Sequence, residues 1–240
     1  MRLANWVRIL GVVAASVSAA VILTTSTTSA YPLRSPQVSF QSTQLQAFLN
    51  TWDGGVNVTT QQLLTPYFQV SSSGNADVTL MAKMTGLASG NSVGVYNTTD
   101  PNNPPALFQI FPAAATPGWY ANCTFKSSGM LIVSLFDNNT VYQGQTTFTG
   151  VDRNHVGFYL FNNSRANPFY SEDGRNSGGS PQVLTYQGTG ANALDLWMCF
   201  EDSPYVPTIA RFVGAILEVE SMVPTPALNA SWGSLKALYR

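Results

Sequence analysis

From Tyr67 onward, apolar and polar residues alternate along most of the chain, which is the period of a β-strand with one buried face. Clusters rich in Asn, Asp, Gly and Pro separate the alternating segments, and these residues favour turns. Many strands with no helices between them are typical of an antiparallel β-sandwich. The pattern predicts strands at residues 76–83, 93–97, 106–111, 119–125, 130–136, 140–148, 155–161, 182–187, 194–200 and 209–220. We therefore predict an all-β fold, an antiparallel and jelly-roll-like β-sandwich.

One segment before these strands has helical spacing. Its apolar residues recur at three- and four-residue steps, at Leu45, Phe48, Leu49 and Trp52. Thr43 and Gln46 at its start fit the capping-box pattern, and Asp53-Gly54-Gly55 ends the run. We predict one short N-terminal helix beside the sandwich.

The first 30 residues have the three-part pattern of a secretory signal peptide. Arg2 and Arg8 flank a basic start, residues 9–23 form an apolar run of 15 residues, and a small-residue stretch ends at Ala30. Because a membrane span needs roughly 20 apolar residues, the run fits a cleaved signal better than an anchor. We expect cleavage after Ala30 and a secreted, extracellular or cell-surface protein with no transmembrane span after signal removal.

Residues 31–222 are predicted to form one β-sandwich domain, followed by a Pro-containing linker and a short tail at 223–240. Val223-Pro224-Thr225-Pro226 cannot continue a central strand, because proline lacks the backbone N–H that a sheet needs. The tail has apolar residues at three-residue steps, at Trp232, Leu235 and Leu238. Two interpretations of the tail remain open, a frayed end and a sorting or docking stripe.

Composition narrows the class of protein. Charged residues make up 10% of the chain against ~25% in an average soluble domain, while 45% is hydrophobic, which excludes an intrinsically disordered chain. The net charge is −1, and removal of residues 1–30 makes it −3. No basic footprint for nucleic acid or an anionic membrane surface is present. The glycines between residues 174 and 179 have no lysine and no following helix, so no phosphate loop and no cofactor are predicted.

The two cysteines, Cys123 and Cys199, leave two alternatives open. An exported chain meets oxidising conditions, and a disulfide closing so long a loop would stabilise the fold by ~4 kcal/mol. Cys123, however, lies on the apolar face of its predicted strand, whereas Cys199 is out of phase with Leu196 and Met198. The cysteines would then face different sides as two unpaired thiols.

One motif suggests nucleophilic catalysis. Gly90-Asn91-Ser92-Val93-Gly94 matches the G-x-S-x-G nucleophile elbow, and Asp137 and His155 follow in the order of the hydrolases. An elbow needs a strand before it and a helix after it, whereas here the motif continues into a predicted strand. His155 is the single histidine, which excludes a multi-histidine metal site. We therefore predict no catalytic residue.

Paired carboxylates are the other candidate chemistry. Glu172-Asp173 and Glu201-Asp202 are neighbours in sequence, so in strands each pair would point to opposite faces. Glu218 and Glu220 share a face, which we expect to be the solvated outer face of a strand.

Several short motifs occur in order along the chain: Asn91-Ser92-Val93-Gly94-Val95-Tyr96, Gly157-Phe158-Tyr159-Leu160, Phe169-Tyr170-Ser171-Glu172-Asp173, residues 182–187 followed by Gly188, and Phe200-Glu201-Asp202. Because it contains these motifs in this order, the chain resembles a family of bacterial exported β-sandwich domains of unknown function. That family typically follows its F-E-D segment with an acidic S-D-x-D-F-N-D stretch, which implies calcium ligation. The C-terminal W-G-x-x-K-x-L-Y-R pattern also resembles short endings of exported bacterial proteins.

The acidic stretch is degenerate in this chain. When Phe212 and Val219-Glu220-Ser221 set the register, the family's acids and amide become Ile209, Arg211, Val213 and Gly214. Arg211 would place a positive charge where the cation should lie. The resemblance therefore implies a lost metal site near Glu201, Asp202 and Arg211, and we expect an ion pair there instead.

These observations predict an exported, noncatalytic structural or adhesion protein of the cell surface or extracellular matrix. Its partners would be other extracellular proteins or itself, as a subunit of an assembly. The alternative is a carbohydrate-binding module, and a secreted hydrolase is the third hypothesis. The aromatic residues that could line a carbohydrate platform are Trp119, Tyr120, Tyr142, Tyr159, Phe169, Tyr170 and Tyr186.

Overall fold

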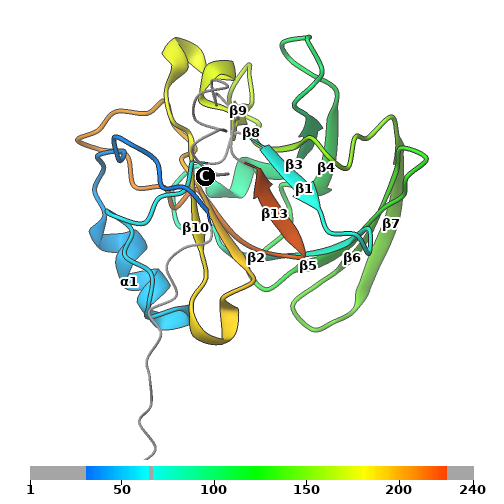
Figure 1. Cartoon of the computed structure of the whole chain (residues 1–240), viewed down its shortest axis with the longest axis horizontal. Helices are drawn as coiled ribbons and strands as arrows, with labels where there is room; N and C mark the ends of the chain where they lie inside the picture. Colours follow the sequence, from blue (N-terminus) through cyan, green and yellow to red (C-terminus); the bar gives the residue numbers. More distant parts are fainter. Residues whose placement is uncertain (1–30, 65–66, 226–240) are drawn as a thin grey trace, which may run out of the picture.

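Two antiparallel β-sheets pack face to face in the computed structural model, which describes residues 31–64 and 67–225 (Figure 1). The six-stranded sheet has the order β13 (Met222–Thr225), β1 (Tyr67–Val70), β8 (Val156–Asn162), β3 (Asn91–Asn97) and β4 (Leu107–Phe111), with β9 (Phe169–Tyr170) paired to β8. The seven-stranded sheet has the order β10 (Val183–Gln187), β11 (Leu196–Phe200), β12 (Ala215–Glu220), β2 (Asn75–Ala82), β5 (Tyr120–Phe125), β6 (Met130–Phe136) and β7 (Tyr142–Thr149). The predicted antiparallel β-sandwich is confirmed.

Every predicted strand overlaps an observed one, but the prediction missed β1, β9 and β13. These strands have only two to four residues, too few for an alternating pattern to stand out. The predicted strand at 209–220 is wrong in its first half, because β12 begins at Ala215. Phe212 has a φ of +55° there, a left-handed conformation that a strand cannot contain.

The helix α1 (Thr43–Trp52) lies where the spacing predicts it. The predicted capping box is wrong, because Ser42 is the N-cap residue and makes no side-chain cap bond. Gln46 instead binds the loop after the helix: its Nε2 donates to the Val56 carbonyl at 2.8 Å and its Oε1 accepts from the Val58 N–H at 3.0 Å. The described connections also contain the short 3₁₀ helices η1 (Ala88–Gly90), η2 (Asp173–Arg175), η3 (Ser177–Gly179) and η4 (Gly190–Asn192).

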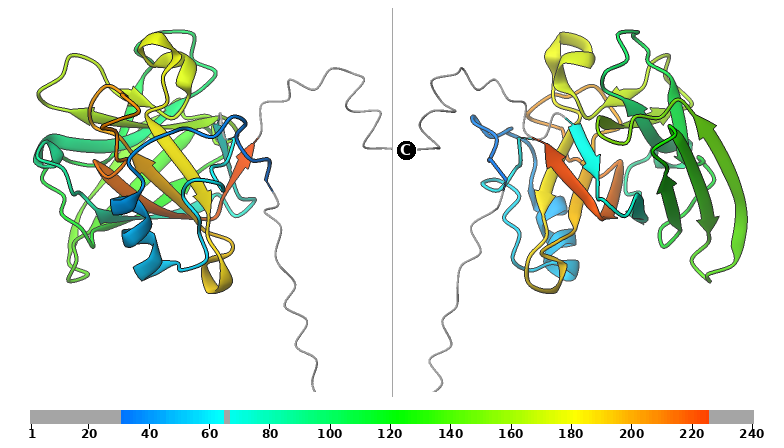
Figure 2. Two further views of the ribbon diagram at one scale, coloured as in Figure 1. Left: turned by 90° about the vertical axis from the view of Figure 1, so that its left-hand side faces the viewer. Right: turned by 45° about the vertical axis from the view of Figure 1, so that its right-hand side comes forward.

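The two faces of the seven-stranded sheet are covered differently. Its inner face meets the six-stranded sheet in the main core, where the Phe108 ring of β4 packs edge-on to the Phe148 ring of β7 with centroids 5.6 Å apart. Its outer face is covered at the β10 to β12 end, where Leu49 of α1 and Trp197 of β11 share a second core. Strands β5 to β7 lie at the opposite end from α1 in Figure 1 and in the right-hand view of Figure 2. Their outer face carries the exposed Tyr142.

Two reciprocal tyrosine–glycine pairs join β3 to β8. Gly94 lies opposite Tyr159, and Tyr96 lies opposite Gly157. A Cβ on Gly157 would lie 2.3 Å from the Tyr96 ring, and a Cβ on Gly94 would lie 2.2 Å from the Phe108 carbonyl oxygen. Glycine is required at both positions because the tyrosine rings and β4 occupy the space of a side chain.

The C-terminal boundary needs a correction. Residues 223–225, assigned by the sequence to a linker, belong to β13, in which Pro224 lies opposite Phe68 of β1. Among the described strands, β13 lies at the edge of its sheet and has a neighbour on one side only. A proline is tolerated there because no described strand on the other side needs the N–H that proline lacks. The expected signal peptide (1–30) and the tail residues Trp232, Leu235 and Leu238 lie outside the described residues. Within the described part, no helix is long and apolar enough to cross a membrane.

Candidate functional site

Glu201 is the first acid of the segment that the resemblance singles out, and it is only 5% exposed. Its Oε2 accepts the backbone N–H groups of Arg211 at 2.7 Å and Phe212 at 3.0 Å. Its Oε1 accepts the Ser203 hydroxyl at 2.7 Å. The carboxylate therefore holds both ends of the loop between β11 and β12, including the left-handed Phe212.

The carboxylate of Asp202 is also hydrogen-bonded within the protein. Its Oδ2 accepts the Asn91 side-chain amide at 2.9 Å and the Thr85 hydroxyl. The same Asn91 amide donates to the Gly214 carbonyl at 3.0 Å, and Asn162 donates to the Asn91 Oδ1 at 2.6 Å. This buried network links β3 and β8 of one sheet to the start of β12 in the other.

The expected ion pair with Arg211 is wrong. The Arg211 guanidinium pairs with neither carboxylate, and Glu201 binds the Arg211 backbone instead. Within the described residues, no group of three or more His, Cys, Asp or Glu side chains could hold a metal ion. Glu201 and Asp202 are thus structural acids.

We expect that millimolar calcium will leave the thermal midpoint of unfolding unchanged. Both carboxylate oxygens of Glu201 and the Oδ2 of Asp202 already accept hydrogen bonds from the protein, while Ca²⁺ needs six or more oxygen ligands. A tightly held ion would stabilise the fold by a few kcal/mol through mass action. Differential scanning calorimetry with calcium and with a chelator measures the difference, and a chelator-sensitive rise of several degrees contradicts the expectation.

A second group of acids is the repulsive cluster Asp53, Asp195, Glu218 and Glu220. Burial, then Glu220 and Asp53, raise the pKa of Asp195 to about 6. Burial is also the largest cause of the raised pKa of Glu218, followed by Asp195 and Glu220. Glu220 is exposed as expected, but Glu218 is half-buried rather than fully solvated. The Asp53 carboxylate accepts the Trp197 indole N–H at 3.1 Å, so it helps to fix α1 against β11.

The residues of the hydrolase pattern do not come together. Ser92 is buried in β3, and its hydroxyl donates to the Phe161 carbonyl at 3.2 Å. The His155 Nδ1 lies 2.8 Å from Asp152 Oδ2, at the end of the β3–β8 ladder away from Ser92. Asp137 accepts N–H groups of its own turn. The 3₁₀ helix η1 precedes Ser92 and a strand contains it, the reverse of a nucleophile elbow.

The cysteines are two buried, unpaired thiols, so the disulfide alternative is wrong. Cys123 faces the main core and Cys199 faces the second core beneath α1, on opposite sides of the same sheet. The phase difference in the sequence indicated this arrangement. Burial, and to a smaller extent Asp77, raise the pKa of the Cys123 thiol to about 12, so this thiol is unreactive at neutral pH.

The candidate platform aromatics divide into three sets. Tyr159, Tyr170 and Tyr186 are buried. Tyr120 and Tyr142 lie on the open outer face of β5 to β7, in a row with Phe136. The Tyr120 and Phe136 rings are stacked with centroids 4.8 Å apart and an interplanar angle of 7°, and Tyr142 meets Phe136 edge-on at 5.6 Å. Because the Tyr120 and Phe136 rings stack face to face, one face of each ring is covered by the other. The row therefore stabilises the open sheet more than it offers a flat platform to a sugar. Trp119 and Phe169 are half-buried, and Phe169 lies in a loop cavity.

In the described part of the chain, strand β7 is an unprotected sheet edge. It contains no charged residue and no proline, and each of its eight residues is exposed or half-buried. A bulge opposite Leu135 and Phe136 bends its first residues, with Gly144 at a φ of +132°. Two other edges are blunted: β13 contains Pro224, and the Thr185 carbonyl of β10 accepts the Leu63 N–H at 2.8 Å.

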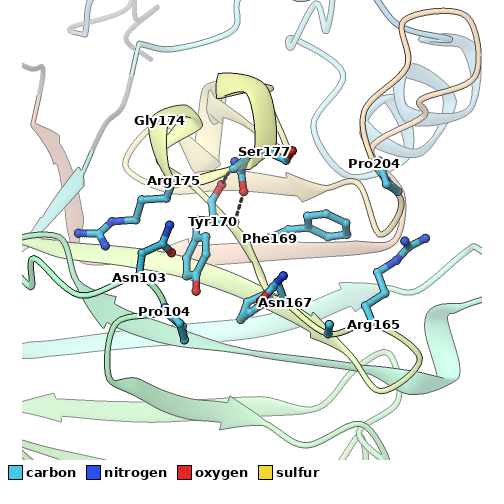
Figure 3. A pocket seen from close by; sticks show the side chains of 13 residues that line it. Asn103, Pro104, Arg165, Asn167, Phe169, Tyr170, Gly174, Arg175, Ser177 and Pro204 are labelled. Carbon is cyan, nitrogen blue, oxygen red and sulfur yellow. Dashed lines mark hydrogen bonds between the residues drawn. The ribbon is translucent and has the colours of Figure 1, made fainter.

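Loops beside β9 surround a cavity of about 540 Å³ (Figure 3). Its lining residues are Asn103, Pro104, Arg165, Ala166, Asn167, Pro168, Phe169, Tyr170, Gly174, Arg175, Asn176, Ser177 and Pro204. The Arg165 guanidinium carbon lies 5.5 Å from the centroid of the Phe169 ring. Sequence reasoning missed Arg165 and the cavity, because the loops that form it are far apart along the chain.

Known proteins give no direct guide to these features. Comparison with protein-family models, with curated proteins and with solved structures finds no match for this chain.

Proposed function

We propose that this protein is an exported, noncatalytic structural β-sandwich of the cell surface or extracellular matrix, and that its copies assemble through strand β7. The observation that carries the proposal is the long, uncharged and proline-free edge of the seven-stranded sheet. Such an edge presents a row of N–H and C=O groups that another strand can satisfy. The signal-peptide pattern supports export.

A second copy of this chain is the partner that the edge fits best. Two β7 strands can meet about a two-fold axis as an antiparallel pair, which joins two seven-stranded sheets into one. No like charges would oppose each other, since β7 has none. Gln145 and Thr147 lie on the same face of β7 and would form cross-strand polar contacts with the partner copy.

The internal use of polar side chains supports a noncatalytic role. Glu201 and Asp202 accept hydrogen bonds from protein donors, and His155 is bonded to Asp152. None of these groups points a free acid, base or nucleophile into the loop cavity.

Sedimentation velocity tests the proposal. We expect the protein to self-associate as its concentration rises, and Thr147→Lys to weaken association by about tenfold because the pair would place a lysine of each copy on the same face of the joined sheet. Asn122→Lys is the matched control: it is exposed on the same sheet face but in the interior strand β5, so it should associate like the unchanged protein. A monomer at all concentrations, or equal effects of both lysines at unchanged melting temperature, overturns the proposal.

A carbohydrate-binding module remains the second candidate, and the loop cavity beside Phe169 favours it. The cavity combines a half-buried aromatic ring with amide, hydroxyl and guanidinium groups, the mixture that binds sugars in concave sites.

A further inference from the structure

The loop cavity has one positive charge, on Arg165, that no acidic side chain of the described residues neutralises. Arg165 donates its Nε to the Asp202 carbonyl at 3.1 Å, and its two terminal nitrogens make no hydrogen bond or ion pair with any described residue. Arg175 is different, because its Nε binds Glu172 at 2.6 Å and its Nη2 binds the Asp100 carbonyl at 2.7 Å. No acidic residue lines the cavity. The free terminal nitrogens of Arg165 therefore suit an anionic group, which a guanidinium can bind with two parallel hydrogen bonds.

Neutral polar groups surround this charge. The side chains of Asn103, Asn167 and Ser177 line the cavity and make no hydrogen bond within the described chain. The Tyr170 side chain is 2% exposed, and its hydroxyl has no hydrogen-bond partner there. In Figure 3 the hydroxyl points toward the side of the cavity formed by Pro104 and Asn167. A buried hydroxyl without a partner is destabilising, and a ligand hydroxyl could relieve that cost.

The walls are fixed before any ligand binds. Asn176 is buried, and its side chain accepts the Tyr170 N–H at 2.8 Å and donates to the Tyr170 carbonyl at 2.9 Å, as the dashed lines in Figure 3 indicate. Arg175 ties the loop at residues 98–102 to Glu172. A preorganised site loses little conformational entropy on binding.

We propose that this cavity binds a hexuronic acid unit, with its carboxylate on Arg165, its hydroxyls on Asn103, Asn167, Ser177 and Tyr170, and its apolar ring edge against Phe169. A carboxylate alone would fill a small part of about 540 Å³, and the uncharged donors and acceptors match ring hydroxyls. This site specifies a ligand for the second candidate function, and it is separate from the β7 edge.

An NMR titration of the protein with three hexuronates, D-glucuronate, D-galacturonate and D-mannuronate, tests the proposal against their neutral sugars and against acetate. We expect saturable shifts in the loops at 165–177 with at least one hexuronate, and binding about tenfold weaker for its neutral sugar and for acetate. Equal binding of the neutral sugar overturns the role of Arg165. Equal binding of acetate overturns the sugar assignment, and no binding of any hexuronate overturns the site.

Two variants sharpen the test. Arg165→Gln should weaken hexuronate binding by about tenfold, whereas Lys126→Gln removes an exposed charge elsewhere and should leave it unchanged. Tyr170→Phe should weaken binding by about fivefold without lowering the melting temperature, since it removes only an unpartnered hydroxyl. Unchanged affinity in both site variants contradicts the proposal. Because self-association through β7 is measured separately, a failure here leaves the assembly proposal standing, and the reverse also holds.

Discussion

Replacing Glu201 with alanine is expected to lower the free energy of unfolding by about 4 kcal/mol. The change leaves two backbone N–H groups without their acceptor, the buried one of Phe212 and the partly buried one of Arg211, and an orphaned buried donor costs about 1–3 kcal/mol. It also releases the left-handed backbone at Phe212, whose fully buried ring packs edge-on to Phe40 at 5.2 Å. Equilibrium unfolding in urea gives the magnitude.

Two controls separate this effect from loss of a negative charge. Glu201→Gln keeps the shape and one acceptor oxygen, so its loss should be about half as large. Glu220→Ala removes an exposed carboxylate and should change stability by less than about 0.5 kcal/mol. Equal losses for Glu201→Ala and Glu220→Ala would show that the carboxylate of Glu201 does not organise the loop.

Replacing Gly94 with alanine is expected to cost about 3 kcal/mol. The new Cβ would lie 2.2 Å from the Phe108 carbonyl oxygen and 2.8 Å from a Tyr159 ring carbon, so the backbone of β4 must shift. Urea unfolding, or the soluble yield if the variant fails to fold, measures the loss.

Gly86→Ala is the matched control, because a Cβ there has no atom within 4 Å, and it should be close to neutral. Ser92→Ala should cost only about 1 kcal/mol, since its hydroxyl makes one hydrogen bond. A stable Gly94→Ala variant would contradict the close packing of β3 against β4 and β8.

The alternating pattern located most strands because it records which face of each strand is buried. β2 shows the agreement, with a regular succession of buried and more exposed residues along its length. The same pattern failed at residues 209–214, where apolar residues suggested a strand. There, two backbone N–H groups donate to the Glu201 carboxylate instead of to a neighbouring strand. The spacing of apolar residues does not reveal these two hydrogen bonds.

The candidate sites were less predictable than the strands. The phase of the two cysteines in their strands indicated the unpaired alternative, one of the two that the sequence left open, because side-chain phase in a strand is a local property. It could not find the partner of Asp202, because Asn91 lies 111 positions away along the chain. It also gave no sign of the cavity around Arg165, whose walls come from the loops near residues 103, 165–177 and 204.

By itself, the sequence determined the antiparallel β-sandwich and the position of α1, because each depends on periodicity over a few residues, and it left the pairing of Cys123 and Cys199 open. The tertiary structure decided that Glu201 and Asp202 hold a loop and a buried network, that β7 is left open as an edge, and that Arg165 faces a cavity. These features depend on contacts between backbone and side-chain groups that are far apart along the chain. The order of the strands in the two sheets determines which of these groups come into contact.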